Sequence, residues 1–502
     1  MKVIVDGSVW IPLDSLSQAQ AGRLRTALTI QPINNSEYAL KDPDPILLYE
    51  ENDTHIGVPR AFYTKNATKE PDFDNRITIG PLVGPGFTPA AFTGSTSGQF
   101  AEQNDAHDAI LALFNQDKAW VGGILQAGCA FGKTAVGLRV AASLGRRTLV
   151  IVNRGFFMRQ WTDRIKTFFP AAKIGYVQQN KCDFRGKDIV IAMVHSLASR
   201  RYEDELYSTF GLVITDEVHR ISSQTWHPTI TMFSAKYRLG LSATPRRKDG
   251  TERVFFEHIG PVIYAAKSES MIPKIARRKT SFVAHPHKYA SGKSIPVRDL
   301  KTSALLSQAS EDPARNKDLV DVILQAIKKG RKVFVVSERL EQLWEMSQML
   351  RQSVEALGLK TTWAFATGDQ YQTFPDGRRI PHDKKKGEFK TRKTTDEDLD
   401  QGESAQVLFA TKQMIEEGFD VCALDVLIVA TPVGDIEQMA GRVRRWCFPE
   451  PKKCARLCPW RAGACTEKPQ PIIVDPVDDN VEKLAKKWIW RKKFYQSIGA
   501  ME

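Results

Sequence analysis

The sequence predicts an α/β protein with two tandem parallel-sheet domains and a small α+β domain ahead of them. Two observations lead to this fold class. Short apolar runs alternate with helix-length segments in two successive series, which is the pattern of parallel sheets covered by helices on both faces. The length of 502 residues is also too great for one ordinary domain.

The two series of apolar runs set the expected domain boundaries. In residues 99–280, a helical pattern precedes strands expected at 120–125, 148–152, 188–193, 211–215 and 237–241. In residues 281–480, strands are expected at 332–336, 406–410, 425–430 and 471–475. Because helix-length segments separate the runs, each series predicts one parallel sheet.

Four further segments do not supply these strands: two flank the two series, and two are insertions in the second. Residues 1–95 predict an accessory α+β domain, with one strand over 56–63, that either grips nucleic acid or is a packing appendage. Residues 369–404 are highly charged and predict a long loop or lid. Residues 446–468 form a cysteine-rich insertion, and residues 481–502 predict a basic aromatic helix.

The composition describes a globular protein with a polyanionic partner. Hydrophobic residues make up 42% and charged residues 26% of the chain, which excludes an intrinsically disordered protein. A formal net charge of +13 favours nucleic acid as the partner. No apolar run approaches the ~20 residues of a membrane span, and the first residues do not resemble a signal peptide. We therefore expect a cytoplasmic protein.

A phosphate-binding loop is predicted at residues 126–134, Gln-Ala-Gly-Cys-Ala-Phe-Gly-Lys-Thr. It joins an apolar strand to a helix, and Gly132 belongs to the small-residue loop between them. Loop N–H groups face the phosphates, Lys133 neutralises β/γ oxygens, and the Thr134 hydroxyl holds Mg²⁺. One departure from the motif is Ala127, where glycine is usual.

Acidic residues follow the strand expected at 211–215, and hydroxyl residues follow the strand expected at 237–241. Asp216 comes directly after the 211–215 strand and can hold Mg²⁺, while Glu217 can position and deprotonate the attacking water. Ser242 and Thr244 follow the last strand of the first series. These two side chains can hydrogen-bond to the region of Asp216 and His219 and so relay the nucleotide state.

An arginine pair is the third strong feature. Arg442 and Arg445 are three residues apart and are expected on one face of a helix. A transition state that spreads charge over γ-phosphoryl oxygens is stabilised by guanidinium groups supplied from outside the phosphate loop. Arginines on the second sheet domain would complete the site only when the two domains close, which would couple hydrolysis to motion.

Together these motifs resemble those of superfamily 2 helicases, over about residues 99–480. Motifs I, II, III and VI are matched by Lys133-Thr134, Asp216-Glu217-Val218-His219, Ser242-Ala243-Thr244 and Gln438 through Arg445. Motif IV is near 336–339, and motif V combines Thr411 with 417–420. The segment Thr244–Gly250 further resembles the XPB/RecG-related branch, and most of all the phage helicases of UvsW type that migrate branched DNA.

The resemblance implies two RecA-like domains that clamp ATP between them, with nucleic acid lying across both. Beyond the phosphate loop and Asp216, the implied cofactor contacts are Gln103, Gly418, Asp420 and Gln438. The implied contacts with the nucleic-acid backbone are Arg154, His195, Ser196, Arg247 and Thr411. Contacts of this kind position the strand without reading its sequence.

Four of the seven cysteines lie close together, at Cys447, Cys454, Cys458 and Cys465. Four thiolates that close a short loop could bind structural Zn²⁺. Their spacing is not that of a standard zinc ribbon, and an iron–sulfur cluster or four unligated thiols remain alternatives. The odd total argues against a disulfide framework.

With this resemblance, the sequence predicts an ATP- and Mg²⁺-dependent DNA helicase or translocase that remodels branched DNA by branch migration, fork reversal or unwinding. Movement from 3′ to 5′ is what the resemblance implies. The expected partners are branched, forked or single-stranded DNA and recombination or replication proteins, with the chain itself a monomer. One alternative is an RNA helicase or transcript-release factor. Another is a translocating subunit that serves a partner nuclease. A non-hydrolysing clamp is disfavoured by the intact catalytic residues.

Overall fold

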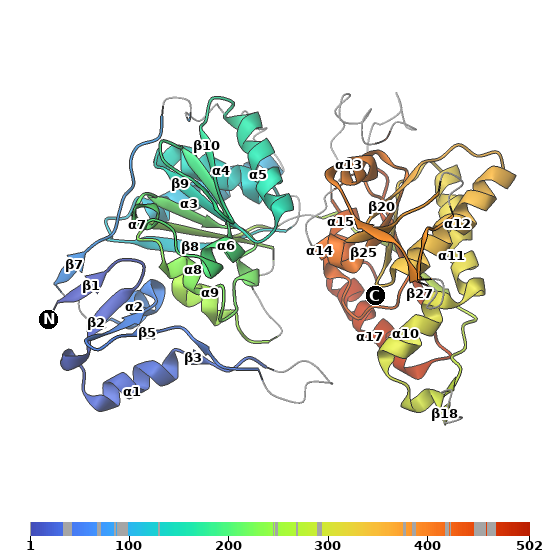
Figure 1. Cartoon of the computed structure of the whole chain (residues 1–502), viewed down its shortest axis with the longest axis horizontal. Coiled ribbons are helices and arrows are strands. Elements are labelled where there is room, and N and C mark those ends of the chain that lie inside the picture. Colours follow the sequence, from blue (N-terminus) through green and yellow to red (C-terminus); the bar gives the residue numbers. More distant parts are fainter. Residues whose placement is uncertain are drawn as a thin grey trace. The chain divides into compact units, whose positions relative to one another are not determined.

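The computed structural model divides into two compact units, residues 1–268 and 269–502, each with its own parallel sheet (Figure 1). The structure describes residues 2–33, 43–67, 72–84, 87, 99–128, 131–243, 245, 249–267, 270–288, 294–374, 378–383, 388–416, 421, 423–445, 458 and 468–502. The predicted α/β fold, with two parallel sheets and a small N-terminal domain, is confirmed. Among the described residues, no helix combines the length and apolar character needed to cross a lipid bilayer.

The N-terminal domain is built on a five-stranded sheet in the order β5-β6-β2-β1-β7. Its elements are β1 (Val3–Val5), β2 (Val9–Pro12), α1 (Gln18–Ala27), β3 (Thr29–Ile30), β4 (Ile46–Leu47), β5 (Glu50–Glu51), β6 (His55–Val58), α2 (Arg60–Asn66) and β7 (Phe73–Asn75). The predicted strand over 56–63 was wrong in its second half, because Pro59 precedes a helix. A proline loses nothing at a helix start, where its missing N–H would have no intrahelical acceptor.

Buried arginines attach the N-terminal domain to the first large sheet. Nη1 of Arg60 donates a 2.6 Å hydrogen bond to the Ala235 carbonyl, and Nη2 of Arg238 donates a 2.6 Å bond to the Gly7 carbonyl. Burial lowers the pKa of both guanidinium groups, to about 10 for Arg238. The Gly7 backbone approaches so closely that a Cβ there would lie 1.4 Å from the Thr231 carbonyl oxygen. The domain is thus an integral part of the first unit.

The first unit contains an eight-stranded sheet in the order β11-β10-β12-β9-β13-β14-β8-β15, parallel except between β10 and β11. Its strands are β8 (Val121–Gln126), β9 (Thr148–Val152), β10 (Ile174–Gln178), β11 (Lys181–Asp183), β12 (Ile189–Met193), β13 (Leu212–Thr215), β14 (Tyr237–Ser242) and β15 (Val262–Ala265). Its helices are α3 (Gln99–Phe114), α4 (Lys133–Leu144), α5 (Gly155–Phe168), α6 (Val194–Ser199), α7 (Asp204–Ser208), α8 (Pro228–Thr231) and α9 (Arg253–His258).

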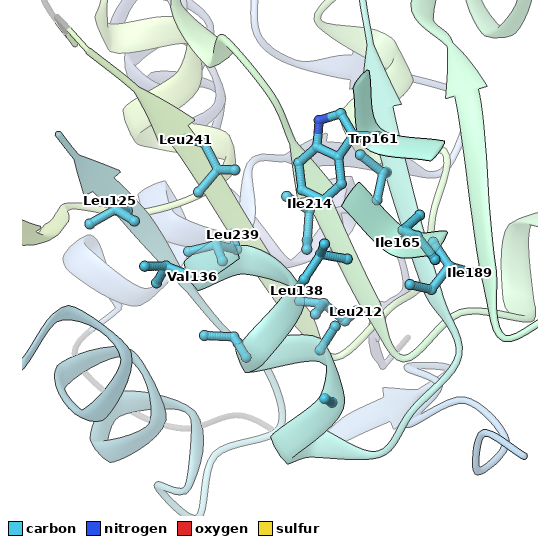
Figure 2. Packing of buried hydrophobic residues seen from close by; sticks show 14 of the residues in the cluster. Leu125, Val136, Leu138, Trp161, Ile165, Ile189, Leu212, Ile214, Leu239 and Leu241 are labelled. Atoms are coloured by element: carbon cyan, nitrogen blue, oxygen red, sulfur yellow. The ribbon is translucent and has the colours of Figure 1, made fainter. Parts of the chain in front are cut away.

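An apolar layer holds α4 and α5 against this sheet (Figure 2). Val136 and Leu138 of α4 and Trp161 of α5 are buried among strand residues such as Ile214. Gly137 of α4 faces Trp161 of α5, since a Cβ at this glycine would be 3.4 Å from the Trp161 ring, in van der Waals contact. This packing fixes the start of α4, and therefore the phosphate loop, relative to the strand ends.

The second unit contains a six-stranded sheet in the order β16-β27-β26-β19-β25-β20, with every neighbouring pair parallel. Its strands are β16 (Lys274–Lys279), β19 (Val333–Ser337), β20 (Trp363–Ala366), β25 (Val407–Thr411), β26 (Val426–Val429) and β27 (Ile472–Val477). Two short strands, β17 (His287–Lys288) and β18 (Ser294–Ile295), pair outside it. The edge strands β16 and β20 were not among the predicted strands.

Helices α10 (Thr302–Glu311), α11 (Pro313–Lys328), α12 (Leu340–Ala356), α14 (Lys412–Glu416), α15 (Glu437–Val443) and α17 (Glu482–Ser497) accompany the second sheet. Two buried ion pairs join α11 and α17 to the sheet. Nε of Arg315 donates to Asp478 at 2.9 Å, and Nε of Arg491 donates to Asp475 of β27 at 2.8 Å. Each arginine also donates to a backbone carbonyl, so neither buried charge lacks hydrogen bonds.

The charged insertion 369–404 is folded where the structure describes it, so the predicted loop was wrong there. It comprises β21 (Asp369–Tyr371), β22 (Pro381–Asp383), β23 (Glu388–Phe389), β24 (Thr391–Lys393) and α13 (Asp396–Ser404), with β21 paired to β24 and β22 to β23. The Arg379 guanidinium lies 3.8 Å from the centre of the Phe389 ring and hydrogen-bonds to Glu341 of α12. Cation–π and charge-assisted contacts replace the apolar core that this composition lacks.

Candidate active site

Three neighbouring strands of the first sheet end beside the predicted phosphate loop. β14 lies between β13 and β8, with Ser242 paired to Gln126 and Gly240 paired to Thr215. Parallel strands end at one edge of a sheet, so the residues that follow them converge. The Ala127 N–H donates a 2.9 Å hydrogen bond to the Ser242 carbonyl, which fixes the start of the loop at this edge.

Gly132 closes the loop at the N-terminus of α4. Its φ of 89° is left-handed, and a Cβ would lie 2.6 Å from Nε2 of Gln103, so backbone and space both call for glycine. The same Nε2 donates to the Phe131 carbonyl. The structure therefore brings the predicted cofactor residue Gln103, on α3, against the phosphate loop. Thr134 is the second residue of α4.

Lys133, the first residue of α4, turns its ammonium group toward the loop. Nζ donates to the carbonyls of Ala127 at 3.0 Å and Gly128 at 3.4 Å. Ala127 is buried and is not among the described residues with positive φ. Alanine therefore replaces the usual glycine without backbone strain, because this conformation is open to any residue.

Asp216 follows β13 and is almost fully buried. Nε1 of Trp161 donates a 2.8 Å hydrogen bond to its Oδ2, and the Glu217 N–H donates a 3.0 Å bond to its Oδ1. Burial and the Glu217 charge raise the pKa of Asp216, while the Trp161 hydrogen bond and the Lys133 charge oppose that rise. Lys133 and Asp216 are thus close enough to interact, and they belong to one site.

Glu217 has a left-handed backbone, φ 46°, which is uncommon outside glycine and is a form of strain found at functional sites. Nδ1 of His219 lies 3.4 Å from Oε2 of Glu217 and 3.0 Å from Oγ of Ser242. His219 therefore connects the predicted catalytic base to the end of β14. The predicted group His219–Ser242 is assembled, and Ser242 is fully buried.

These residues fit a nucleotide with Mg²⁺. Lys133 stands at a helix N-terminus, where N–H groups and the helix dipole favour phosphate. The Thr134 hydroxyl and the Asp216 carboxylate are the hard oxygen ligands that Mg²⁺ prefers, and they would hold it. The bound ion would neutralise phosphate charge.

Comparisons with known proteins found a matching family model and several similar proteins. Residues 99–247 match the family model "Type III restriction enzyme, res subunit". A mimivirus (Acanthamoeba polyphaga mimivirus) protein named as an ATP-dependent RNA helicase is 26% identical over 94% of this chain and 81% of its own length. The DNA 3′-5′ translocase XPB2 of Sulfurisphaera tokodaii is 32% identical over 32% of this chain, which spans 37% of that protein.

The chain is similar in sequence to superfamily 2 helicases. The crystal structure of T4 UvsW also aligns, with a TM-score of 0.36 and 13% identity over 99% of this chain and 98% of that one. The enzyme class supported by the sequence relatives is an ATP-dependent helicase that acts on nucleic acid.

In the first unit of this helicase, the predicted nucleic-acid residues fall in two groups. Arg154 precedes α5 and His195 lies on α6; both are exposed, and burial together with the nearby Arg154 charge lowers the pKa of His195. Ser196 is buried, and its Oγ accepts a 2.9 Å hydrogen bond from the Gln179 N–H. Arg154 therefore offers an accessible cation near the exposed imidazole of His195, whereas the Ser196 hydroxyl already supports a turn.

In the second unit, the helicase arginines lie at the end of α15. The expectation that Arg442 and Arg445 share one helix was wrong, because α15 ends at Val443 and Arg445 follows it. Both side chains are buried. Lys468 donates to the carbonyls of Val443 and Arg445, both at 2.8 Å, and so holds the chain after the helix. Gln438 is exposed on α15.

Thr411 is half-buried at the end of β25, where it pairs with Ser337 of β19. Beside it lies a buried polar network that the sequence did not predict. Oγ of Ser337 is 2.7 Å from Gln342 and 2.6 Å from the Thr431 hydroxyl, and Gln342 also donates to Asn316. The only sequence feature that indicated this network was the pair of hydroxyl residues, Ser337 and Thr431, at the ends of two strands.

Several predicted residues lie outside the described part of the chain: Thr244, Arg247, Gly418, Asp420, Cys447, Cys454 and Cys465. Cys458 is described, and it is buried in the core of the second unit. Among the described residues, no group of three or more His, Cys, Asp or Glu side chains could hold a metal. The predicted cysteine metal site thus has no support from the described residues.

Proposed function

We propose that this helicase uses ATP hydrolysis to move along DNA, 3′ to 5′, and remodels branched DNA by branch migration, fork reversal or unwinding. The observation that carries the motor function is the His219 contact with both Glu217 and Ser242. This contact joins the candidate base, after β13, to the end of the neighbouring strand β14. A displacement of Glu217 when ATP is hydrolysed can therefore be transmitted to the sheet.

We assign the site residues roles within this proposal. Lys133 and the loop N–H groups hold the phosphates, while Thr134 and Asp216 hold Mg²⁺. Glu217 accepts the proton of the attacking water. Arg442 and Arg445 of the second unit stabilise the charge that develops on the transferred phosphoryl group.

The choice of DNA rests on the similarity to the Sulfurisphaera tokodaii protein named as a DNA 3′-5′ translocase. The choice of branched DNA rests on the N-terminal domain. Because Arg60 and Arg238 hold this domain firmly on the first unit, it moves with the motor. A body fixed beside the motor can hold one arm of a junction while the sheet domains draw in another strand.

Two other functions have a specific observation in their favour. An RNA helicase is favoured by the mimivirus relative, which matches 94% of this chain and is named for RNA. A translocating subunit that serves a nuclease is favoured by the matching family model, whose description is a restriction-enzyme subunit.

A four-way junction with homologous arms and a fluorescent donor–acceptor pair tests the proposal. Branch migration separates the dyes, so energy transfer falls with time. We expect this fall with ATP, and neither with a non-hydrolysable analogue nor with the Glu217→Gln variant. Unwinding of an RNA duplex with no rearrangement of the junction would favour the RNA helicase. ATP-driven displacement of a bound protein block without junction rearrangement would favour the translocating subunit.

A further inference from the structure

Helix α17 presents one large aromatic side chain to solvent. Trp490 is 67% exposed, and Ile489 beside it is 53% exposed (α17 is the red helix in Figure 1). Trp488 and Tyr495 of the same helix are buried in the core of the second unit. These two residues attach the helix to its domain, so packing does not account for Trp490.

Lysines surround Trp490. Glu482 is the single carboxylate of α17 and pairs with Lys486 at 2.7 Å, while Lys483, Lys492 and Lys493 are exposed cations of the same helix. Lys486 and Lys493 lie one turn before and one turn after Trp490, on the same face of the helix. Nζ of Lys493 lies 5.7 Å from the centre of the Trp490 ring.

The charge of this surface selects the class of partner. An apolar protein surface that covered Trp490 would also strip water from the adjacent ammonium groups, which is costly without compensating anions. A nucleic-acid strand offers the opposite combination, with flat bases for the indole and phosphates for the lysines.

The position of the helix points the same way. Lys487, three residues before Trp490, lies close enough to Glu338 and Lys412 for their charges to act on its pKa, which burial lowers. Glu338 and Lys412 form an ion pair of 3.7 Å. Lys412 directly follows Thr411, a predicted backbone contact of the helicase. This side of α17 therefore borders the edge at which nucleic acid is expected.

We infer that Trp490, with Lys486 and Lys493, is an accessory contact for a single nucleic-acid strand, beside the helicase motifs of the second unit. The indole stacks on a base, and the ammonium groups pair with the flanking phosphates. Every base has a flat face, so this contact tolerates any sequence. The inference rests on the proposed function, a motor that moves along nucleic acid. It adds a second binding contact for the strand.

Strand binding by three variants tests the inference. Fluorescence anisotropy with labelled oligo-dT and oligo-U gives Kd for the wild type, Trp490→Ala, Trp490→Phe and Ile489→Ala. We expect Trp490→Ala to weaken binding about tenfold, the loss of one stacked base, and Trp490→Phe to retain most of it. Ile489→Ala removes a neighbouring exposed apolar side chain, so its Kd should equal that of the wild type. The two oligonucleotides show whether DNA or RNA is held.

Lys493→Ala supplies an independent measurement on the same surface. Loss of one phosphate contact should reduce the slope of log Kd against log salt by about 1. ATP turnover without nucleic acid should not change in any of these variants, because α17 contains none of the residues assigned to ATP hydrolysis.

Equal binding by Trp490→Ala and the wild type would overturn the inference. So would an equal loss in Ile489→Ala, which would indicate a general apolar contact. A changed molecular mass of Trp490→Ala in solution, with unchanged strand binding, would assign the surface to a protein partner and also overturn it. Failure of the proposed function looks different, since the wild-type protein would then leave the four-way junction unchanged.

Discussion

Nε1 of Trp161 donates a 2.8 Å hydrogen bond to Oδ2 of Asp216, across 55 positions of sequence. Trp161 lies on α5, the helix that Arg154 precedes, and is fully buried. The bond therefore links the helix nearest one predicted nucleic-acid contact to the predicted Mg²⁺ ligand. A shift of α5 when nucleic acid binds would change the hydrogen bond that the Asp216 carboxylate accepts.

Trp161→Phe tests this link through the pH dependence of ATP turnover. The indole hydrogen bond favours ionised Asp216, so its removal should raise the pKa of Asp216 further. Asp216 must be ionised to hold Mg²⁺, so turnover is lost when the pH falls below the pKa of Asp216. In Trp161→Phe this loss should occur at a higher pH than in the wild type. Trp344→Phe, in the second unit, should leave the profile unchanged. Superimposable profiles for Trp161→Phe and the wild type would contradict the link.

Glu217→Gln should abolish ATP hydrolysis and leave ATP binding intact. The amide keeps the shape of the side chain but cannot accept the proton of the attacking water. Turnover is measured by phosphate release, and binding by titration with a fluorescent nucleotide. Glu203→Gln, at an exposed ion pair with Arg185, is the matched control and should behave as the wild type. Turnover of the Glu217 variant above roughly 1% of wild type would exclude Glu217 as the base.

Arg445→Ala should reduce ATP turnover by about 10³ if its guanidinium stabilises the transition state. Arg445→Lys should recover only part of this loss, because an ammonium group lacks the planar fork of donors. Arg351→Ala, on α12 of the same unit, serves as the control. Because Arg445 is buried, the thermal midpoint of each variant must be compared as well. Near-normal turnover in Arg445→Ala would remove Arg445 from the site.

Gly7→Ala should destabilise the attachment of the N-terminal domain. A Cβ at this position would overlap the Thr231 carbonyl oxygen, so the domain must move away or distort. We expect a fall of the first thermal unfolding midpoint and faster proteolysis between the domain and the sheet. Gly22→Ala, inside α1 with no heavy atom within 4 Å of its Cβ, should instead stabilise by about 0.5–1 kcal/mol. Equal midpoints for the two variants would contradict the close packing at Gly7.

The central strands and the nucleotide site were predictable because their signals are local. Short apolar runs rich in β-branched residues, such as 148–152, favour buried strands, and the phosphate loop and the carboxylates are recognised within a few residues. Strand β16 gave no such signal. Its sequence, Lys-Ile-Ala-Arg-Arg-Lys, is half-exposed at a sheet edge and becomes a strand by pairing with β27.

The remaining features depend on contacts between distant residues. The Trp161–Asp216 hydrogen bond requires the packing of α5 on the sheet, which no local pattern contains. The insertion 369–404 lacks an apolar core and folds around Arg379 and its aromatic neighbours, so a rule based on hydrophobic periodicity missed it. The early end of α15 could not be read either, because Arg444 and Arg445 suit a helix as well as a bend.

The most direct measurement is the rate of ATP turnover in the presence of single-stranded DNA, duplex DNA, forked DNA, a four-way junction or single-stranded RNA. Each nucleic acid is added at the same concentration, counted in nucleotides. A motor that remodels branched DNA should be stimulated most by the fork and the four-way junction, with little response to RNA. Stimulation by RNA above all DNA substrates, or equal stimulation by every duplex, would contradict the account and leave a helicase with a different substrate.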